Sequence, residues 1–420
     1  MTGCVVVAND VKAQENSPYS RYGLGDLYNT QHVVNRGMGG VSQAYSDFQS
    51  VNFTNPASYS NLKLVTYDVA LEGGVKKITD KDQSFSSGLG NLAYLQLGIP
   101  LRNKWGVVAG LRPMTNVSYN ITRSEERIFF DTLQMPVLYQ YEGTGGVYQA
   151  YIGSGFGWKG ISVGFNAGYI FGNIQNSTKA IYPLESNTFP SQHSKRTTYQ
   201  SFFYNIGLQY EIKLNKETSM VLGASGNFEQ KLKARREVLR ETLYYDAGSN
   251  DYGTQDTVSY TSGDRGNIVY PQQFGAGIMF KKIDKWQFGA DFTSGKWSEY
   301  RNYKEADSTR DTWKVAVGGQ FTPNVLALKG YWNRVTYRLG GYYGQDYIKL
   351  GGQDMSAMAV TFGAGLPVRR MMYSNQFSIV NLSFEIGRRG DNNTLLKENF
   401  YRVGLGFSLS DRWFIKQKYD

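Results

Sequence analysis

The chain has 420 residues, of which 41% are hydrophobic and 15% aromatic, and its formal charge at pH 7 is +10. No apolar run approaches the roughly 18 residues that a membrane-spanning helix needs, so a helical membrane protein is excluded. One Cys cannot form a disulfide within the chain, and with only two His a structural zinc site is not expected, so we predict no metal and no cofactor. The positive charge comes without a basic helix or an aromatic motif of a nucleic-acid module, so no nucleic-acid partner is expected.

Residues 1–13 are interpreted as the remnant of a secretory signal peptide. A short apolar patch is followed by Val11-Lys12-Ala13, an imperfect match to the small-residue cleavage site. The start also resembles a lipid-attachment box around Cys4, but no apolar segment precedes it, so lipidation is not favoured.

The next region, residues 14–60, lacks sustained alternation and is rich in Gly, Ser, Tyr and Asn. Within it, Pro56 fixes its own φ and disfavours the helical conformation for Asn55, whose side chain can bond to local backbone. The small residues Ala57 and Gly39-Gly40 allow close packing. An ordinary surface turn is the alternative, since Asn-Pro is a common turn dipeptide.

From residue 61 to residue 420 the sequence alternates apolar and polar positions again and again. The clearest case runs from Ile161 to Phe171, with small or polar residues at every second position. Such alternation indicates strands with one apolar face, as in the wall of a membrane barrel. The segments that alternate are 65–71, 95–101, 107–121, 148–158, 161–171, 202–212, 220–228, 274–280, 286–292, 313–321, 335–343, 358–366, 380–386 and 401–409.

Short and long connections alternate in the first half of this region. Turns of about two to seven residues follow the second, fourth, sixth and eighth segments, whereas long loops are expected near 78–90, 122–145, 175–197 and 234–266. A soluble β-sandwich or propeller is the alternative, but no repeat of about 40 residues is evident. The sequence therefore predicts an all-β fold, a 14-stranded antiparallel transmembrane β-barrel.

The lumen of such a barrel is too wide for wall side chains to fill, so residues 14–60 are predicted to form an N-terminal plug inside it. The segments 36–41 and 52–58, R-G-M-G-G-V and N-F-T-N-P-A-S, resemble the hatch of FadL/TodX outer-membrane transporters. Residues 17–23 and 413–416 resemble the Bacteroidetes branch, which includes PorV-like proteins. A final aromatic residue is usual in these barrels, but here six residues follow Phe414. The resemblance implies hatch residues Gly37, Gly39, Gly40, Asn55, Pro56 and Ala57.

A catalytic site is not predicted. His32 falls in the region of the expected plug, and His193, in an expected loop, has no carboxylate beside it in sequence. A hydrolase would need a nucleophile or acid pair next to such a histidine. We expect no enzyme activity.

The resemblance implies passive transport of hydrophobic, fatty-acid-like molecules through the bacterial outer membrane, by way of an apolar pocket in the lumen. The alternative is a barrel without transport activity that serves as a subunit of a secretion or barrel-assembly complex. Tyrosine-rich stretches such as 244–246 fit that alternative, because exposed tyrosine is favoured at interfaces. The basic run 231–236 is a candidate contact for lipopolysaccharide.

Overall fold

The structure, a computed structural model, describes most of the chain. The predictions for residues 1–13, for Cys4 and for Phe414 lie outside the described residues. The described ranges are 17–79, 84–129, 133–182, 188–249, 251–327, 329–350, 352–368, 377–391, 394 and 396–411.

The fold is a closed antiparallel β-barrel of 14 strands, which confirms the predicted class. Two strands are interrupted: β8 and β9 together form the seventh, and β10 and β11 form the eighth, because β8 pairs with β11 and β9 with β10. The barrel closes where β19 pairs with β2. The strands are β2 (Val65–Thr79), β3 (Ser84–Arg102), β4 (Trp105–Phe129), β5 (Leu133–Trp158), β6 (Ile161–Ile181), β7 (Ser191–Lys213), β8 (Thr218–Asn227), β9 (Gln230–Asp246), β10 (Asp251–Tyr270), β11 (Gln273–Lys282), β12 (Trp286–Gly295), β15 (Thr312–Phe321), β16 (Thr336–Leu350), β17 (Gln353–Pro367), β18 (Phe377–Arg389) and β19 (Lys397–Asp411).

The other elements of the described residues are short. No helix among them is long and apolar enough to cross a membrane. They are η1 (Pro18–Arg21), β1 (Asp26–Leu27), α1 (Val33–Arg36), η2 (Pro56–Asn61), η3 (Trp297–Glu299), β13 (Arg301–Asn302), β14 (Glu305–Ala306) and η4 (Tyr331–Arg334).

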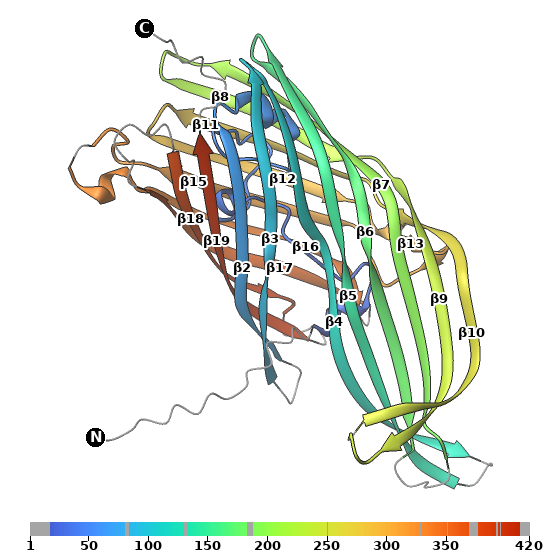
Figure 1. Cartoon of the computed structure of the whole chain (residues 1–420). Helices are drawn as coiled ribbons and strands as arrows, with labels where there is room; N and C mark the ends of the chain where they lie inside the picture. Colours follow the sequence, from blue (N-terminus) through green and yellow to red (C-terminus); the bar gives the residue numbers. More distant parts are fainter. Residues whose placement is uncertain are drawn as a thin grey trace, which may run out of the picture.

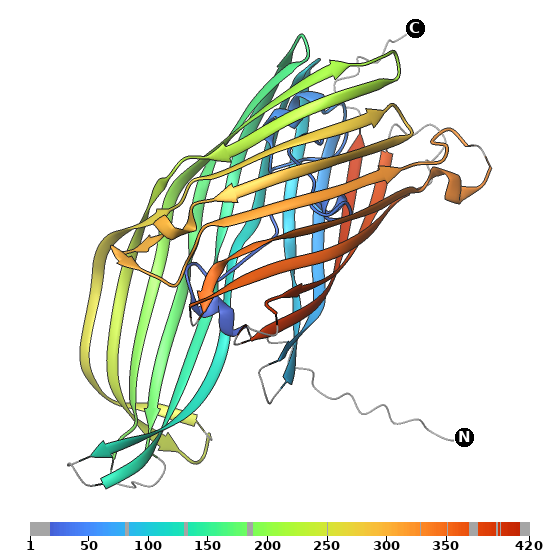
Figure 2. The same ribbon diagram turned by 180° about the vertical axis from the view of Figure 1, so that it is seen from behind.

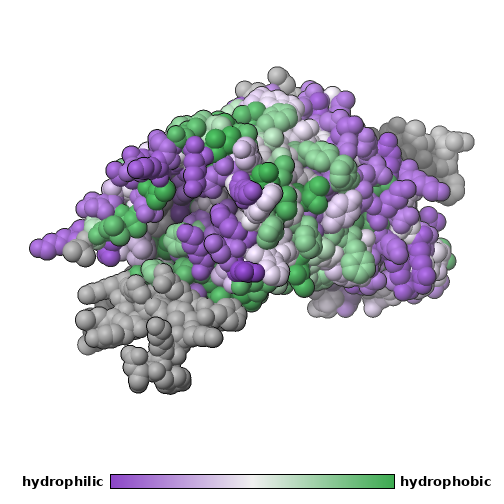
Figure 3. All heavy atoms as spheres, turned by 90° about the horizontal axis from the view of Figure 1, so that it is seen from above, coloured by the Kyte–Doolittle hydropathy of each residue, from purple (hydrophilic) through white to green (hydrophobic). Residues whose placement is uncertain are grey.

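The wall turns apolar side chains outward and polar ones inward. On β6, Val163 and Phe165 are about half exposed, whereas Ser162 and Asn166 are buried. This is the reverse of a soluble protein and the pattern of a barrel whose outer face meets lipid. In Figure 3 hydrophobic residues gather over the middle of the molecule and hydrophilic residues toward its two sides.

The expectation of long loops was wrong, because most of the residues assigned to them continue the strands. β4 has 25 residues and β5 has 26. At about 3.3 Å per residue, both strands are much longer than is needed to cross an apolar band of about 25 Å. Outward apolar residues stop at the edge of that band, but neighbouring polar strands keep pairing through their backbones. The result is a wall of β4–β7, β9 and β10 that projects at one end of the barrel (Figures 1 and 2).

The short turns lie at the opposite end, as expected. They are residues 103–104, 159–160, 214–217 and 283–285. The projecting wall therefore lies at the end of the barrel opposite the short turns.

Candidate functional site: the N-terminal segment inside the barrel

The N-terminal segment, residues 17–64, lies within the barrel, where it appears in blue in Figure 1. At its start the Ser17 N–H donates to the Ser118 carbonyl of β4 (2.7 Å), and β1 pairs with β4. Farther along, α1 contacts β17, β18 and β19, and η2 contacts β5 and β6. The segment thus runs from the half of the barrel with the projecting wall to the short-turn end, where β2 begins.

The predicted hatch glycines lie where this segment touches the wall. Gly37 ends α1, and Gly39 and Gly40 have φ of 70° and 87°, the left-handed region that favours glycine. A Cβ on Gly39 would lie 2.6 Å from the backbone N and O of Gly341 in β16. The Gly39 N–H also donates to Thr361 Oγ1 of β17 at 2.7 Å. Glycine at this position permits backbone-to-backbone contact with the barrel.

Asn55 joins the segment to two wall strands. Its Oδ1 accepts the Ala57 N–H (3.1 Å), which caps the start of η2. Its Nδ2 lies within hydrogen-bonding distance of the carbonyls of Gln43 (2.6 Å), Leu208 (3.1 Å) and Ala224 (3.2 Å). The amide therefore uses its acceptor locally, and its donors reach both Gln43 of the same segment and the strands β7 and β8.

Pro56 packs against glycines of the wall. A Cβ on Gly164 of β6 would lie 2.4 Å from the Pro56 carbonyl oxygen, and one on Gly155 of β5 would lie 2.6 Å from it. The close approach of η2 to β5 and β6 therefore depends on the absence of side chains at these two wall positions.

A partly buried charge cluster, here called the Asp26 cluster, holds the half of the segment that lies on the side of the projecting wall. Asp26 contacts Arg389 of β18 (2.8 Å) and Lys76 of β2 (3.6 Å), and Arg389 also donates to Asp346 of β16 (3.0 Å). Burial raises the pKa of Asp26, but Lys76 and Arg389 outweigh it and lower that pKa to about 2. Asp26 is therefore ionised at neutral pH.

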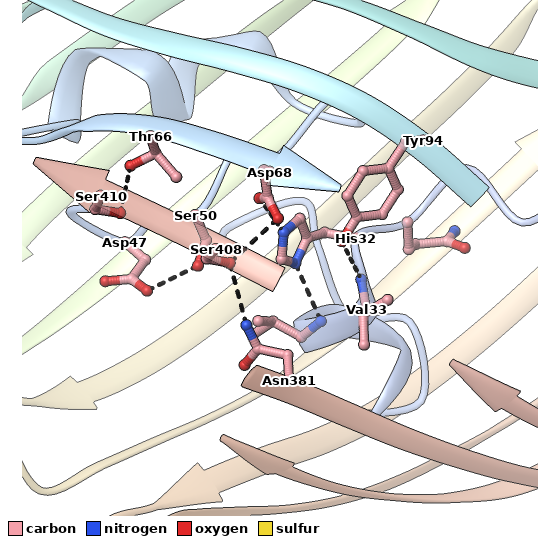
Figure 4. Close-up of polar contacts among 12 residues, drawn as sticks. His32, Val33, Asp47, Ser50, Thr66, Asp68, Tyr94, Asn381, Ser408 and Ser410 are labelled. Atoms are coloured by element: carbon pink, nitrogen blue, oxygen red, sulfur yellow. Dashed lines mark hydrogen bonds and ion pairs between the residues drawn. The ribbon is translucent and has the colours of Figure 1, made fainter. Parts of the chain in front are cut away.

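Two further polar pairs hold α1. Arg36 Nη1 donates to Glu72 Oε2. His32 Nε2 contacts Asp68 Oδ2 (Figure 4), and both carboxylates are on β2. All four side chains are buried. Each pair joins α1 to the first barrel strand.

The hydrogen bonds of His32 give it an anchoring role. Its Nδ1 accepts the Val34 N–H at 3.1 Å, so the Nε2 nitrogen carries the proton and donates to Asp68. The ring stacks on Tyr94 with centroids 5.0 Å apart, and Ser408 donates to the other oxygen of Asp68 at 3.1 Å (Figure 4). Because Ser408 bonds to the carboxylate and not to the imidazole, this arrangement is not that of a hydrolytic triad.

His193 lies on β7, not in the loop that the sequence suggested. It is paired with Thr178 of β6 and Arg240 of β9, and the Arg240 Nε donates to its Nδ1 at 3.3 Å. Among the described residues there is no group of three or more His, Cys, Asp or Glu that could hold a metal ion.

Two cavities lie beside the N-terminal segment. The larger, about 300 Å³, borders the Asp26 cluster, and its lining combines charged and amide side chains with apolar and aromatic ones such as Leu89, Trp297 and Phe400. The second, about 240 Å³, includes an apolar side formed by Phe53, Met114, Ile170 and Phe203. Each cavity therefore has an apolar side, and neither is the wholly apolar pocket that the resemblance implies.

Sequence reasoning missed the Asp26 cluster and the partners of His32 and Arg36. The available signal was the placement of Asp68 and Glu72 on the inward face of β2, where an unpaired carboxylate would be costly. The partners themselves come from residues far apart in the chain.

Comparison with solved structures shows a shared fold. The chain is similar to the "CymD monoaromatic hydrocarbon channel" (TM-score 0.56, 12% identity, covering 93% of this chain and 98% of that one). It is also similar to the toluene transporter TodX of Pseudomonas putida (TM-score 0.54, 16% identity, covering 93% of this chain and 99% of that one). A FadL homologue of Pseudomonas aeruginosa is similar as well (TM-score 0.54, 12% identity, covering 94% of this chain and 100% of that one). At these identities the likeness concerns the fold alone.

Comparison with curated proteins gives no match. The model of the BamG family matches residues 1–420, the whole of the chain. This chain therefore belongs to the BamG family.

Proposed function

We propose that this protein is a barrel of the bacterial outer membrane, closed by a plug formed by its N-terminal segment, and that it serves as a subunit of a secretion or barrel-assembly complex. The observation that carries the proposal is the set of polar pairs that join the segment to the wall; the pairs of His32 and Arg36 are buried, and that of Asp26 is partly buried. Removing one partner of a buried ion pair costs about 3–5 kcal/mol. A bore closed by such pairs would be costly to open. This favours a subunit that binds other proteins over a transport channel.

Membership of the BamG family, rather than of a family named for transport, supports the same reading. The outward apolar band and the one-sided arrangement of short turns support placement in the outer membrane. The kinship with PorV-like barrels, suggested by residues 17–23, stays a prediction from the sequence.

The projecting wall offers a surface for a protein partner. Near the end of β9 and on β10, Tyr244, Tyr245, Val258 and Tyr260 have large exposed side chains. Exposed aromatic groups of this kind are enriched at protein interfaces and supply much of their binding energy. The wall places them far from the apolar band, within reach of an external protein.

The test is to purify the tagged protein from its native membrane in mild detergent, after chemical crosslinking. We expect a stoichiometric partner with the native chain and its loss in a variant with Tyr244, Tyr245 and Tyr260 replaced by Ser. The matched control replaces Tyr331 and Trp332, exposed aromatics near the short-turn end, and should keep the partner. A native chain that is monomeric after crosslinking would overturn the proposal.

A second candidate is passive transport of hydrophobic small molecules. It is favoured by the apolar side of the 240 Å³ cavity and by the fold shared with hydrocarbon channels. Movement of Asn55, Pro56 and Ala57 would then open the path. Solvent extraction and mass spectrometry should find a bound hydrophobe that is lost in Met114→Gln, which lines the cavity, but kept in Met355→Gln, a buried methionine of β17.

A further inference from the structure

An apolar groove runs along the outer face of the barrel, on β6, β7, β8, β11 and β12. In one row across the wall Leu208 lies opposite Ala224, Ala224 opposite Ala276, and Ala276 opposite Phe292. Two alanines side by side between larger residues leave a depression of about 690 Å³. Its lining residues are Val163, Gly164, Ile206, Gly207, Leu208, Ala224, Ser225, Gly226, Phe274, Gly275, Ala276, Phe292 and Ser294.

A basic cluster lies on the same wall, farther toward the end of the barrel opposite the short turns. Lys231, Lys233 and Arg235 occupy alternate positions of β9 and are exposed, whereas the residues between them, Leu232 and Ala234, are buried. The three basic side chains therefore share the outward face. None of them has an acidic partner among the described residues.

Arg265 of β10 adds a fourth positive charge, because it lies directly opposite Arg235 in the antiparallel pair. Residues directly opposite share a face, and like charges in that position destabilise a sheet. Two arginines placed so are compatible with a stable wall when an anion lies between them.

The groove and the basic cluster form one continuous surface. Phe228 and Phe274 lie between them, with ring centroids 5.5 Å apart and both rings exposed. Lys231 lies five positions along the chain from Gly226, which is at the near end of the groove, and five positions of extended chain span about 17 Å. A single amphipathic molecule with an anionic head and an acyl chain spans that distance.

We propose that this surface binds a phosphorylated glycolipid of the outer leaflet, such as the lipid A part of lipopolysaccharide. Its phosphates lie along the basic cluster from Arg235 and Arg265 to Lys231 in charge-assisted hydrogen bonds, and one acyl chain runs from Lys231 past Phe228 into the groove at Gly226. The location selects this lipid, because membrane barrels carry short turns on the periplasmic side, and the cluster is on the opposite side, where the outer leaflet is. The site is separate from the bore; it rests on the placement in the outer membrane proposed above and not on the role in a complex.

The test is native mass spectrometry of the full-length protein in mild detergent, titrated with lipid A. We expect retained lipid in the native protein and at least a tenfold loss of affinity in the double variant Arg235→Gln, Arg265→Gln. Filling the groove with Ala224→Leu and Ala276→Leu should lower the affinity through the acyl chain. Heat-dependent migration on gels verifies that each variant forms a barrel.

Controls separate this site from general attraction between a basic protein and an anionic lipid. Lys216→Gln with Lys285→Gln removes two exposed positive charges at the short-turn end and should leave affinity unchanged. Dephosphorylated lipid A should bind the native protein at least tenfold more weakly. Equal affinity of the native protein and both double variants, or equally tight binding of phosphatidylglycerol, would overturn the proposal.

Discussion

Inside the barrel, Arg389 Nη1 donates a hydrogen bond of 2.8 Å to Asp26 Oδ1, although the two residues are 363 positions apart in the chain. The guanidinium of Arg389 also lies over the ring of Tyr19 at 4.7 Å, so one arginine of β18 holds two points of the N-terminal segment. The beginning of the chain is thereby fixed to one of its last strands.

Replacing Asp26 with Asn should loosen the half of the segment that lies on the side of the projecting wall. The variant loses a charged hydrogen bond worth about 2 kcal/mol, so hydrogen exchange of residues 17–31 should become on the order of 30-fold faster. Asp251→Asn, which changes an exposed residue of β10, should leave that exchange rate as it is. Unchanged exchange in Asp26→Asn would contradict an anchoring role.

The same carboxylate predicts a pH dependence. The pKa of Asp26 is about 2 in the folded protein and 3.8 in an unperturbed chain, so ionised Asp26 stabilises the docked segment above pH 4. This stabilisation is lost as the pH falls from about 4 to 2. Exchange of residues 17–31, corrected for the intrinsic effect of pH, should accelerate over that interval in the native protein and not in Asp26→Asn.

Gly39→Ala should disturb the contact of the segment with β16. The new methyl group meets backbone atoms of Gly341 at 2.6 Å, and alanine is strained at φ of 70°. We expect a loss of about 2–4 kcal/mol in the free energy of unfolding, measured by urea titration in detergent. Gly90→Ala is the control, because a Cβ at Gly90 has nothing within 4 Å.

Asn55→Ala should weaken the junction between the segment and β7 and β8. The variant removes the hydrogen-bond partner of the Leu208 carbonyl, the Ala224 carbonyl and the Ala57 N–H. Each buried group left unsatisfied lowers the free energy of unfolding by about 1–3 kcal/mol. Single-barrel conductance in a planar bilayer should then show openings that the native protein lacks. Asn61→Ala, in the same short helix but bonded only to the exposed Lys104, should stay closed like the native protein.

The class of fold could be predicted because the outward residues of a membrane barrel are apolar and occupy every second position of a strand. Ile161 to Phe171 shows that pattern with hardly a break, and the strand begins at Ile161 as predicted but continues to Ile181. The projecting wall could not be predicted in this way. Beyond Asn173 the outward residues of β6 are polar, and a polar strand held by backbone pairing resembles a loop in sequence.

The contacts of the N-terminal segment were predictable only in part. Gly39, Gly40 and the Asn55-Pro56-Ala57 turn stand out because backbone geometry demands particular residues there. The charge pairs do not, since Arg389 can be matched to Asp26 only after 14 strands have been placed around the bore.

The seam between β19 and β2 sets an order of events during biogenesis. The first barrel strand cannot find its second neighbour until the final strand has been made, some 330 residues later. The N-terminal segment directly precedes that first strand and lies inside the barrel. It therefore has to enter the bore before β19 pairs with β2 and closes the barrel. If β19 paired with β2 before the N-terminal segment had entered the bore, that segment would be left outside the closed barrel.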